Sequence, residues 1–230
     1  MLATWATSLQ SLSLPHSRLS PVPSSPSSQL DSLNLTTHRR SFPGVSTRLM
    51  TSSDEKHRIE RIASSIRVIP NFPKPGIMFQ DITTLLLDPN AFGDTVELFV
   101  ERYRDQRISV VAGVEARGFI FGPPIALAIG AKFVPLRKPK KLPGEVISEE
   151  YSLEYGTDKI EMHVGAVQPN DRAIVIDDLI ATGGTLCAAV KLLERVGAVV
   201  VECACVIELP ELNGREKLGG IPLFVLINRA

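Results

Sequence analysis

The feature that most constrains the fold is one short segment, Ile174 to Thr185, which reads Ile-Val-Ile-Asp-Asp-Leu-Ile-Ala-Thr-Gly-Gly-Thr. An apolar run leads into two acids, and a loop follows in which two threonines flank two glycines. Beyond it, residues 186–196 carry apolar side chains at helical spacing, and Gly197 ends them. Strand, glycine loop and helix in this order point backbone N–H groups and a helix N-terminus at one phosphate. The segment therefore predicts phosphate binding at the carboxyl end of a strand in an α/β sheet.

The loop differs from two common nucleotide-binding motifs. A Walker loop requires a Lys after its glycines, and none follows here. The dinucleotide-binding pattern G-x-G-x-x-G is also absent. Asp177 and Asp178 directly precede the loop, where two carboxylates can accept hydrogen bonds from the hydroxyls of a bound sugar phosphate. The alternative is a turn at the start of a helix, in which the acids serve only as caps.

Other apolar runs predict that residues 54–230 form one α/β domain. Five runs are rich in Val and Ile and bounded by turn residues: Ile108–Ala112, Phe133–Leu136, Ala173–Ile176, Val199–Ile207 and Leu223–Ile227. Because these runs do not alternate, they suit strands that are buried on both faces of a parallel sheet. Helices are expected at Asp54–Ile66 and Asp94–Tyr103.

Residues 1–53 have a different composition from the rest of the chain. They hold fourteen serines, four arginines, no lysine and one acid, and five prolines interrupt any helix. Such a segment cannot bury enough apolar surface to fold, and its composition is typical of an organelle transit peptide. We expect a disordered transit peptide for the chloroplast, with the mitochondrion or a plain disordered tail as alternatives. Initiation at Met50 would give a cytoplasmic form.

Composition also disfavours several classes of partner and site. The formal net charge is zero, so no basic excess indicates nucleic acid, and no apolar run is long enough to span a membrane. The three cysteines form no C-x-x-C pair, which disfavours a zinc site. Cys203 and Cys205 lie two residues apart in an apolar run, so we expect both to be small buried residues on one strand face.

The segment Ile174–Thr185 closely resembles the 5-phosphoribosyl-1-pyrophosphate signature of the type I phosphoribosyltransferases. The similarity extends over nearly all of residues 58–227. It implies the fold of that family, an α/β domain with a mostly parallel central sheet, flanking helices and a mobile lid over the active site. It also implies that Asp177 and Asp178 hold the ribose 2′- and 3′-hydroxyls. The residues implied to wrap the 5′-phosphate are Ala181, Thr182, Gly183, Gly184 and Thr185.

Residues 67–82 resemble the segment that binds the base in adenine phosphoribosyltransferases. Its prolines stiffen a loop, and Phe79 offers a flat face to stack on a purine. Backbone from Met78 to Gln80 can accept hydrogen bonds from the 6-amino group. The family often has Arg where this chain has Gln80, and this difference weakens the argument that the Gln80 side chain contacts the base. Leu209 matches a position on the other side of the base, and a plain core leucine is the alternative.

Two further segments resemble the pyrophosphate site of the family. Residues 113–119 follow a predicted strand and place Arg117 between glycines, where it would clamp the anion; a surface salt bridge is the alternative. Residues 137–144 begin with four bases in a row of five, and a solvated charged face is the usual explanation of such a run. The resemblance implies instead that Lys138 and Lys141 contact the pyrophosphate.

Residues 144–157 lack strong periodicity and include Gly144 and Gly156, which suits a mobile lid. Within them, residues 151–156 read Tyr-Ser-Leu-Glu-Tyr-Gly, which matches adenine-specific members of the family. The resemblance implies that Glu154 is the acid/base that exchanges a proton with adenine. Tyr155 is expected to cover the site with its ring.

The activity that the resemblance implies is the joining of adenine to the ribose of 5-phosphoribosyl-1-pyrophosphate, which gives AMP and pyrophosphate in purine salvage. Cytokinin bases are a second class of expected substrate. Mg²⁺ is expected to arrive on the pyrophosphate and ribose, with no direct protein ligand, and the family implies a homodimer. Two alternatives stay open: a phosphoribosyltransferase for another base, and a non-catalytic regulator that senses the ribosyl donor. Glu154 and Arg117 favour chemistry over sensing.

Overall fold

The computed structural model of the chain describes residues 52–152 and 157–229. The expected transit peptide, residues 1–53, lies outside the described part except for its last two residues. Met50, Glu154 and Tyr155 also lie outside it.

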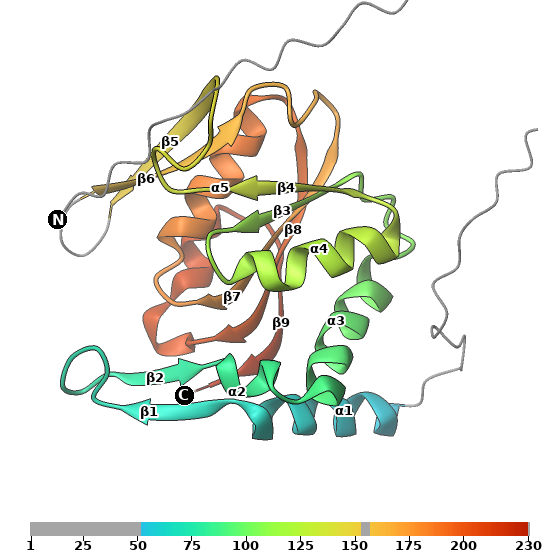
Figure 1. The fold of residues 1–230 in the computed structure, drawn as a ribbon, viewed down its shortest axis with the longest axis vertical. Helices are drawn as coiled ribbons and strands as arrows, with labels where there is room; N and C mark the ends of the chain where they lie inside the picture. Colours follow the sequence, from blue (N-terminus) through green and yellow to red (C-terminus); the bar gives the residue numbers. More distant parts are fainter. Residues whose placement is uncertain (1–51, 153–156, 230) are drawn as a thin grey trace, which may run out of the picture. The chain divides into compact units, whose positions relative to one another are not determined.

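A five-stranded sheet lies at the centre of the domain, and all of its strand pairs are parallel (Figure 1). Its strands in spatial order are β4 (Lys132–Leu136), β3 (Val110–Val114), β7 (Arg172–Ile180), β8 (Val199–Glu208) and β9 (Leu223–Asn228). Each strand contains or overlaps one of the five apolar runs in the sequence, which confirms the predicted parallel sheet. Strand β7 continues past the expected end at Ile176, so both acids of the signature lie on the strand itself.

Helices cover both faces of the sheet (Figure 1). Each face has its own apolar core. Helix α5 (Gly184–Arg195) packs on one face. On the other lie α1 (Ser52–Ser65), α3 (Pro89–Tyr103) and α4 (Gly118–Ile129). The short turns α2 (Thr83–Leu86), η1 (Pro210–Leu212) and η2 (Gly214–Leu218) connect the larger elements. None of the described helices is long and apolar enough to cross a bilayer.

Helix α3 begins at Pro89 and not at the predicted Asp94. Asp88 caps it, because its side chain accepts hydrogen bonds from the backbone N–H groups of Asn90 at 2.9 Å and Ala91 at 3.2 Å. Proline is favoured at the first helical position, so the Asp-Pro pair was a usable start signal. The prediction relied on apolar periodicity alone and therefore began one turn too late.

The proline-containing segment 67–82, predicted as a stiff loop, begins and ends with short strands. Strands β1 (Arg67–Pro70) and β2 (Met78–Asp81) pair antiparallel, and the loop between them carries the prolines at 73 and 75. An ion pair between Arg67 Nη2 and Asp81 Oδ2, at 2.6 Å, fastens the hairpin at its base. Hydrogen bonds from Thr83, together with Arg67, lower the pKa of Asp81 to about 2. Strands of four residues are too short to show a periodic pattern in the sequence.

A second two-stranded ribbon, here called the arm, occupies most of the segment expected to be an irregular lid. It consists of β5 (Val146–Ser152) and β6 (Thr157–His163), which pair antiparallel along their whole length. The arm rests on α5, where Arg195 Nη1 lies 3.0 Å from Glu149 Oε2. The sequence did not indicate these strands, because a ribbon with one solvated face needs few apolar residues and its apolar pattern is therefore weak. Residues 153–156, which join the two strands, lie outside the described residues.

The cysteines lie as predicted. Cys203 and Cys205 are fully buried on the α5 side of β8, while Cys187 is half-buried on α5. Burial raises the pKa of the Cys203 thiol to about 12, and burial also raises that of Cys205.

Candidate active site

A cleft of about 480 Å³ opens beside the carboxyl ends of β3 and β7. Strands, loops and the arm all contribute to its walls. The residues that line it are Val114, Glu115, Ala116, Arg117, Lys138, Tyr151, Asp158, Asp177, Asp178, Leu179, Ile180, Ala181, Thr182, Gly183, Gly184, Thr185 and Leu186. The structure thus brings the predicted phosphate loop, both acids, Arg117 and Lys138 to one place. It adds Glu115, Tyr151 and Asp158, which the sequence analysis had not singled out.

The loop from Ala181 to Thr185 is shaped by backbone contacts. Gly183 has a φ of +75°, and a Cβ there would lie 2.2 Å from the carbonyl oxygen of Gly214. Only glycine fits both the conformation and the space. Helix α5 starts at Gly184 directly after this turn, so its first N–H groups face the cleft. An anion in the cleft would meet a ready-made set of donors.

Gly214 packs against the backbone of this loop. It was not identified from the sequence as part of the site. A Cβ on it would lie 2.2 Å from the carbonyl oxygen of Ala181, so the two chain segments meet backbone to backbone. The preceding Asn213 has a φ of +51°, as expected for an Asn-Gly turn. That dipeptide was a signal for a turn, although not for its contact with a loop thirty residues earlier in the chain.

The two acids of the signature have different surroundings. Asp178 is 3% exposed, and its Oδ2 lies 2.6 Å from Nε of Arg117. Asp177 accepts a hydrogen bond at Oδ1 from the backbone N–H of Asp178, at 2.9 Å. Burial raises the pKa of Asp177 well above its usual range, and the charge of Asp178 raises it further. One carboxylate therefore has a cationic partner, whereas the other is held closer to its neutral form.

Arg117 lies at the end of a loop packed tightly against the sheet. At Gly118 a Cβ would be 2.4 Å from the carbonyl oxygen of Ile176, and at Gly113 it would be 2.6 Å from the ring of Phe133. These glycines let residues 115–117 sit directly above the ends of β3 and β7. The guanidinium carbon of Arg117 is 6.0 Å from the centroid of the Phe79 ring, which brings β2 next to the cleft.

The residues of the basic segment 137–141 have different roles: one pairs with a protein carboxylate, and another lines the cleft. Arg137 makes two hydrogen bonds to the carboxylate of Glu115, each of 3.1 Å, and this pairing lowers the pKa of Glu115. Arg137 is thereby committed to a protein partner. The backbone N–H of Lys138 also donates to Glu115, at 3.0 Å, and the Lys138 side chain lines the cleft. Lys141 is exposed and does not line it.

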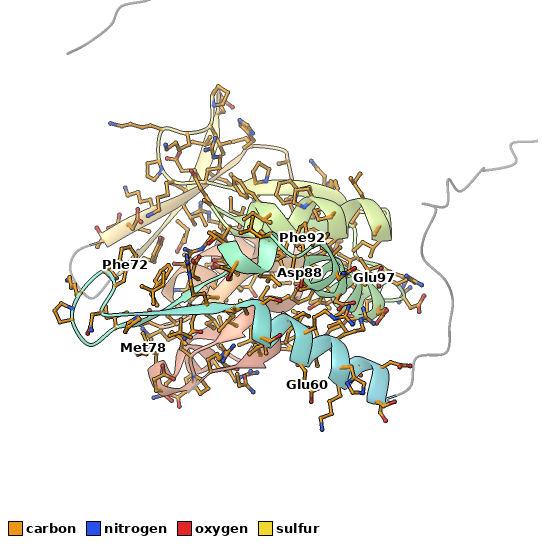
Figure 2. All side chains as sticks on the ribbon, turned by 60° about the horizontal axis from the view of Figure 1, so that its bottom comes forward. Glu60, Phe72, Met78, Asp88, Phe92 and Glu97 are labelled. Carbon is orange, nitrogen blue, oxygen red and sulfur yellow. The ribbon has the colours of Figure 1, made fainter. Side chains whose placement is uncertain are left out.

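The residues predicted to hold the base lie beside the cleft and not in its lining. Phe79 on β2 packs edge to face with Phe72, with ring centroids 5.0 Å apart. Figure 2 shows Phe72 and Met78 on the β1–β2 hairpin, and Met78 is 56% exposed. Nε2 of Gln80 donates to the Met78 carbonyl oxygen at 3.4 Å, so its amide is directed to its own strand. Leu209 is half-buried against the α1, α3 and α4 core, and its N–H donates to Ile180 at 3.0 Å.

The described residues contain no group of three or more His, Cys, Asp or Glu that could enclose a metal ion. The cleft does offer the adjacent carboxylates Asp177 and Asp178. Mg²⁺ keeps several waters and commonly binds through one or two carboxylates together with substrate phosphates. This donor set fits an Mg²⁺ ion that enters with a phosphorylated substrate.

Comparison with known proteins adds a family to this geometry. Residues 82–218 match the family model described as "Phosphoribosyl transferase domain". Adenine phosphoribosyltransferase 1 of Triticum aestivum is 85% identical over 170 residues, which cover 74% of this chain and 94% of the relative. The chloroplastic adenine phosphoribosyltransferase 1 of Arabidopsis thaliana is 71% identical over 209 residues, covering 89% and 86%. The Saccharomyces cerevisiae adenine phosphoribosyltransferase, solved with an imino-altritol bisphosphate and adenine, has 38% identity and a TM-score of 0.72, over 75% of this chain and 99% of that one.

Proposed function

The chain belongs to the adenine phosphoribosyltransferase family of type I phosphoribosyltransferases, and we propose that the cleft beside β3 and β7 is its active site. It is a pentosyltransferase that joins adenine to the ribose of 5-phosphoribosyl-1-pyrophosphate and yields AMP and pyrophosphate. The observation that carries the assignment of the cleft is the meeting of the phosphate loop, Asp177, Asp178 and Arg117 around one cavity.

One molecule of the ribosyl donor would span the cleft, with its 5′-phosphate at one wall and its pyrophosphate at the other. Its 5′-phosphate fits the loop from Ala181 to Thr185, where backbone N–H groups and the start of α5 point inward. Asp177 and Asp178 would accept hydrogen bonds from the ribose hydroxyls. Before the donor binds, Asp178 is paired with Arg117 at 2.6 Å. A pyrophosphate group gives Arg117 a more highly charged partner, which frees Asp178 to accept a hydrogen bond from a ribose hydroxyl.

Stabilising the departing pyrophosphate is the main task of the opposite wall. Arg117 and Lys138 lie there in the cleft. Lys141, which is exposed on the same basic segment, stays a proposed further contact of the pyrophosphate. Fixed cations act where negative charge develops in the transition state. An Mg²⁺ ion that arrives on the donor would supply further neutralisation of that charge.

Adenine would stack on Phe79, with Leu209 on its other side and the backbone from Met78 to Gln80 at its edge. N9 forms a bond to ribose C1 while the bond from C1 to the pyrophosphate oxygen breaks, and its electron pair leaves with the pyrophosphate. The base loses a proton, which Glu154 would accept. Glu154 and Tyr155 lie outside the described residues. Support for their role comes from the arm, because Tyr151 and Asp158 on either side of them line the cleft.

We also propose where the protein is located and how it assembles. The transit-like composition of residues 1–53 and the chloroplastic relative support import into the chloroplast, with a cytoplasmic form from Met50. A fluorescent protein fused to residues 1–53 should enter chloroplasts; retention in the cytosol would refute the targeting. We expect a homodimer, to be tested by sedimentation.

Steady-state turnover of a panel of bases tests the function directly. The purified chain should convert adenine faster than hypoxanthine, guanine, xanthine or orotate, and it should need Mg²⁺, so that a chelator stops AMP formation. Cytokinin bases belong in the same panel as adenine-like substrates. Equal or faster turnover of guanine or orotate would overturn the choice of base. Donor binding without nucleotide formation from any base would indicate a regulator and not an enzyme.

A further inference from the structure

Three side chains join at the mouth of the cleft, where the arm meets the basic segment. Nζ of Lys138 lies 2.6 Å from Oδ2 of Asp158, and the Tyr151 hydroxyl donates to the same oxygen at 3.1 Å. Asp158 lies on β6 and Tyr151 on β5, opposite each other in the register of the arm. The Asp158 side chain is 19% exposed and that of Lys138 is 56% exposed, so the pair stands at the boundary between protein and solvent.

This cluster connects to both anion-binding loops. The backbone N–H of Lys138 donates to Glu115, the residue two positions before Arg117, at 3.0 Å. On the other side, burial raises the pKa of Tyr151, and a side-chain hydrogen bond with Thr185 of the phosphate loop partly offsets this. The hydrogen bond with Lys138 lowers the pKa of Asp158, which keeps it charged at neutral pH. Lys138 is therefore fixed at its backbone by one carboxylate and at its ammonium by another.

We propose that Asp158 is a positioning residue that holds the Lys138 ammonium over the cleft, ready for the pyrophosphate of the donor. A lysine ammonium has three N–H donors, so one bond to Asp158 leaves two for the ligand. A free lysine samples many rotamers, and ordering it before binding removes that part of the cost of binding. The inference rests on the proposed function, which places Lys138 at the pyrophosphate.

Donor binding by Asp158→Asn is the first test. The amide keeps the shape and one acceptor but loses the charge that holds Lys138. Calorimetry with 5-phosphoribosyl-1-pyrophosphate and Mg²⁺ should show binding weakened about three- to fivefold, at the upper end of the range for a partly exposed charged pair. Affinity for adenine should be unchanged. Glu150→Gln is the matched control, because Glu150 on the same arm pairs with Lys159 at 3.3 Å in an exposed position. It should bind the donor normally.

The same substitution in a Lys138→Met background separates positioning from support of the arm. If Asp158 acts through Lys138, Asp158→Asn should change donor affinity less than about twofold in that background. An equal loss in both backgrounds would overturn the proposal, and so would normal or tighter donor binding by Asp158→Asn alone. Normal binding by Lys138→Met would remove Lys138 from the pyrophosphate site and this inference with it. AMP formation by the unmodified chain would still stand as a separate test of the reaction.

Discussion

The two walls of the cleft are built in different ways. On one side the loop from Ala181 to Thr185 takes its shape from backbone contacts, with Gly183 and Gly214 touching main chain to main chain. On the other side the arm and the basic segment meet through charged side chains, as in the pair of Lys138 with Asp158. The first wall presents donors that need not move when an anion arrives. The second contains charges that already have partners in the protein.

This difference suggests that each wall binds a different part of the donor. A rigid wall of backbone donors suits the 5′-phosphate, which stays the same throughout the reaction. A wall of paired side chains suits the pyrophosphate, which changes charge as it departs, because ion pairs can exchange partners. We therefore expect changes in the loop to act on binding of the 5′-phosphate, and changes in the arm to act on binding of the pyrophosphate and on turnover.

The largest effect should come from Glu154→Gln, in the segment of sequence that joins the two strands of the arm. The neutral amide cannot take the proton of adenine, so the single-turnover rate should fall about 10²–10⁴-fold, the range for general acid–base groups. Binding of adenine and donor should stay near normal. Tyr155→Phe, which retains the ring, is the neighbouring control and should lose much less. A single-turnover rate within about threefold of the unmodified enzyme, well below that range, would remove Glu154 from the mechanism.

Gly183→Ala tests the opposite wall. Its Cβ would meet the Gly214 carbonyl, so the loop must shift, and donor affinity should fall by about a hundredfold or more, equivalent to about 3 kcal/mol. Gly130→Ala is the control: Gly130 has a similar φ of +74° with nothing within 4 Å of an added Cβ. Both variants carry the same backbone strain, but only Gly183→Ala should lose the donor by calorimetry. Similar donor affinities in the two would show that the loop is not shaped by this contact.

Asp177→Asn and Asp178→Asn should each weaken donor binding by about ten- to a hundredfold, because a hydrogen bond to a charged group is worth about 1.5–3 kcal/mol. Adenine affinity should change little in either variant, as titration of adenine alone would show. If both variants kept the donor affinity of the unmodified enzyme, the two acids would be structural.

The smallest expected effect concerns stability. The pKa of Asp177 is raised in the folded chain, so the folded state binds more protons and loses stability as pH rises above about 4. Asp177→Asn removes this dependence and should raise the melting temperature at pH 8 by about 2–4 °C, with a smaller gain at pH 5. Asp178→Asn, which loses the pairing with Arg117, should give no such gain. A larger gain at pH 5 than at pH 8 would contradict the assignment.

The two walls also differed in how far the sequence predicted them. Glycines and acids in fixed order leave few local structures open, so Ile174–Thr185 indicated both the fold and the phosphate site. The arm has no such pattern, because its strands have few apolar residues. The pair of Lys138 with Asp158 joins residues twenty apart in sequence, and only the ribbon brings them together. Gly214 was missed for the same reason, since a contact between two loops leaves no mark in either one.

The sulfur chemistry of the molecule has a consequence for how the protein withstands oxidants. Only a thiolate reacts readily with peroxides or disulfides. Cys203 and Cys205 lie under α5 with raised pKa values, so they remain protonated and shielded at any physiological pH. We therefore expect these two thiols to resist oxidation as long as the protein stays folded. A small alkylating reagent should modify Cys187 in the native protein and all three thiols once the sheet is unfolded.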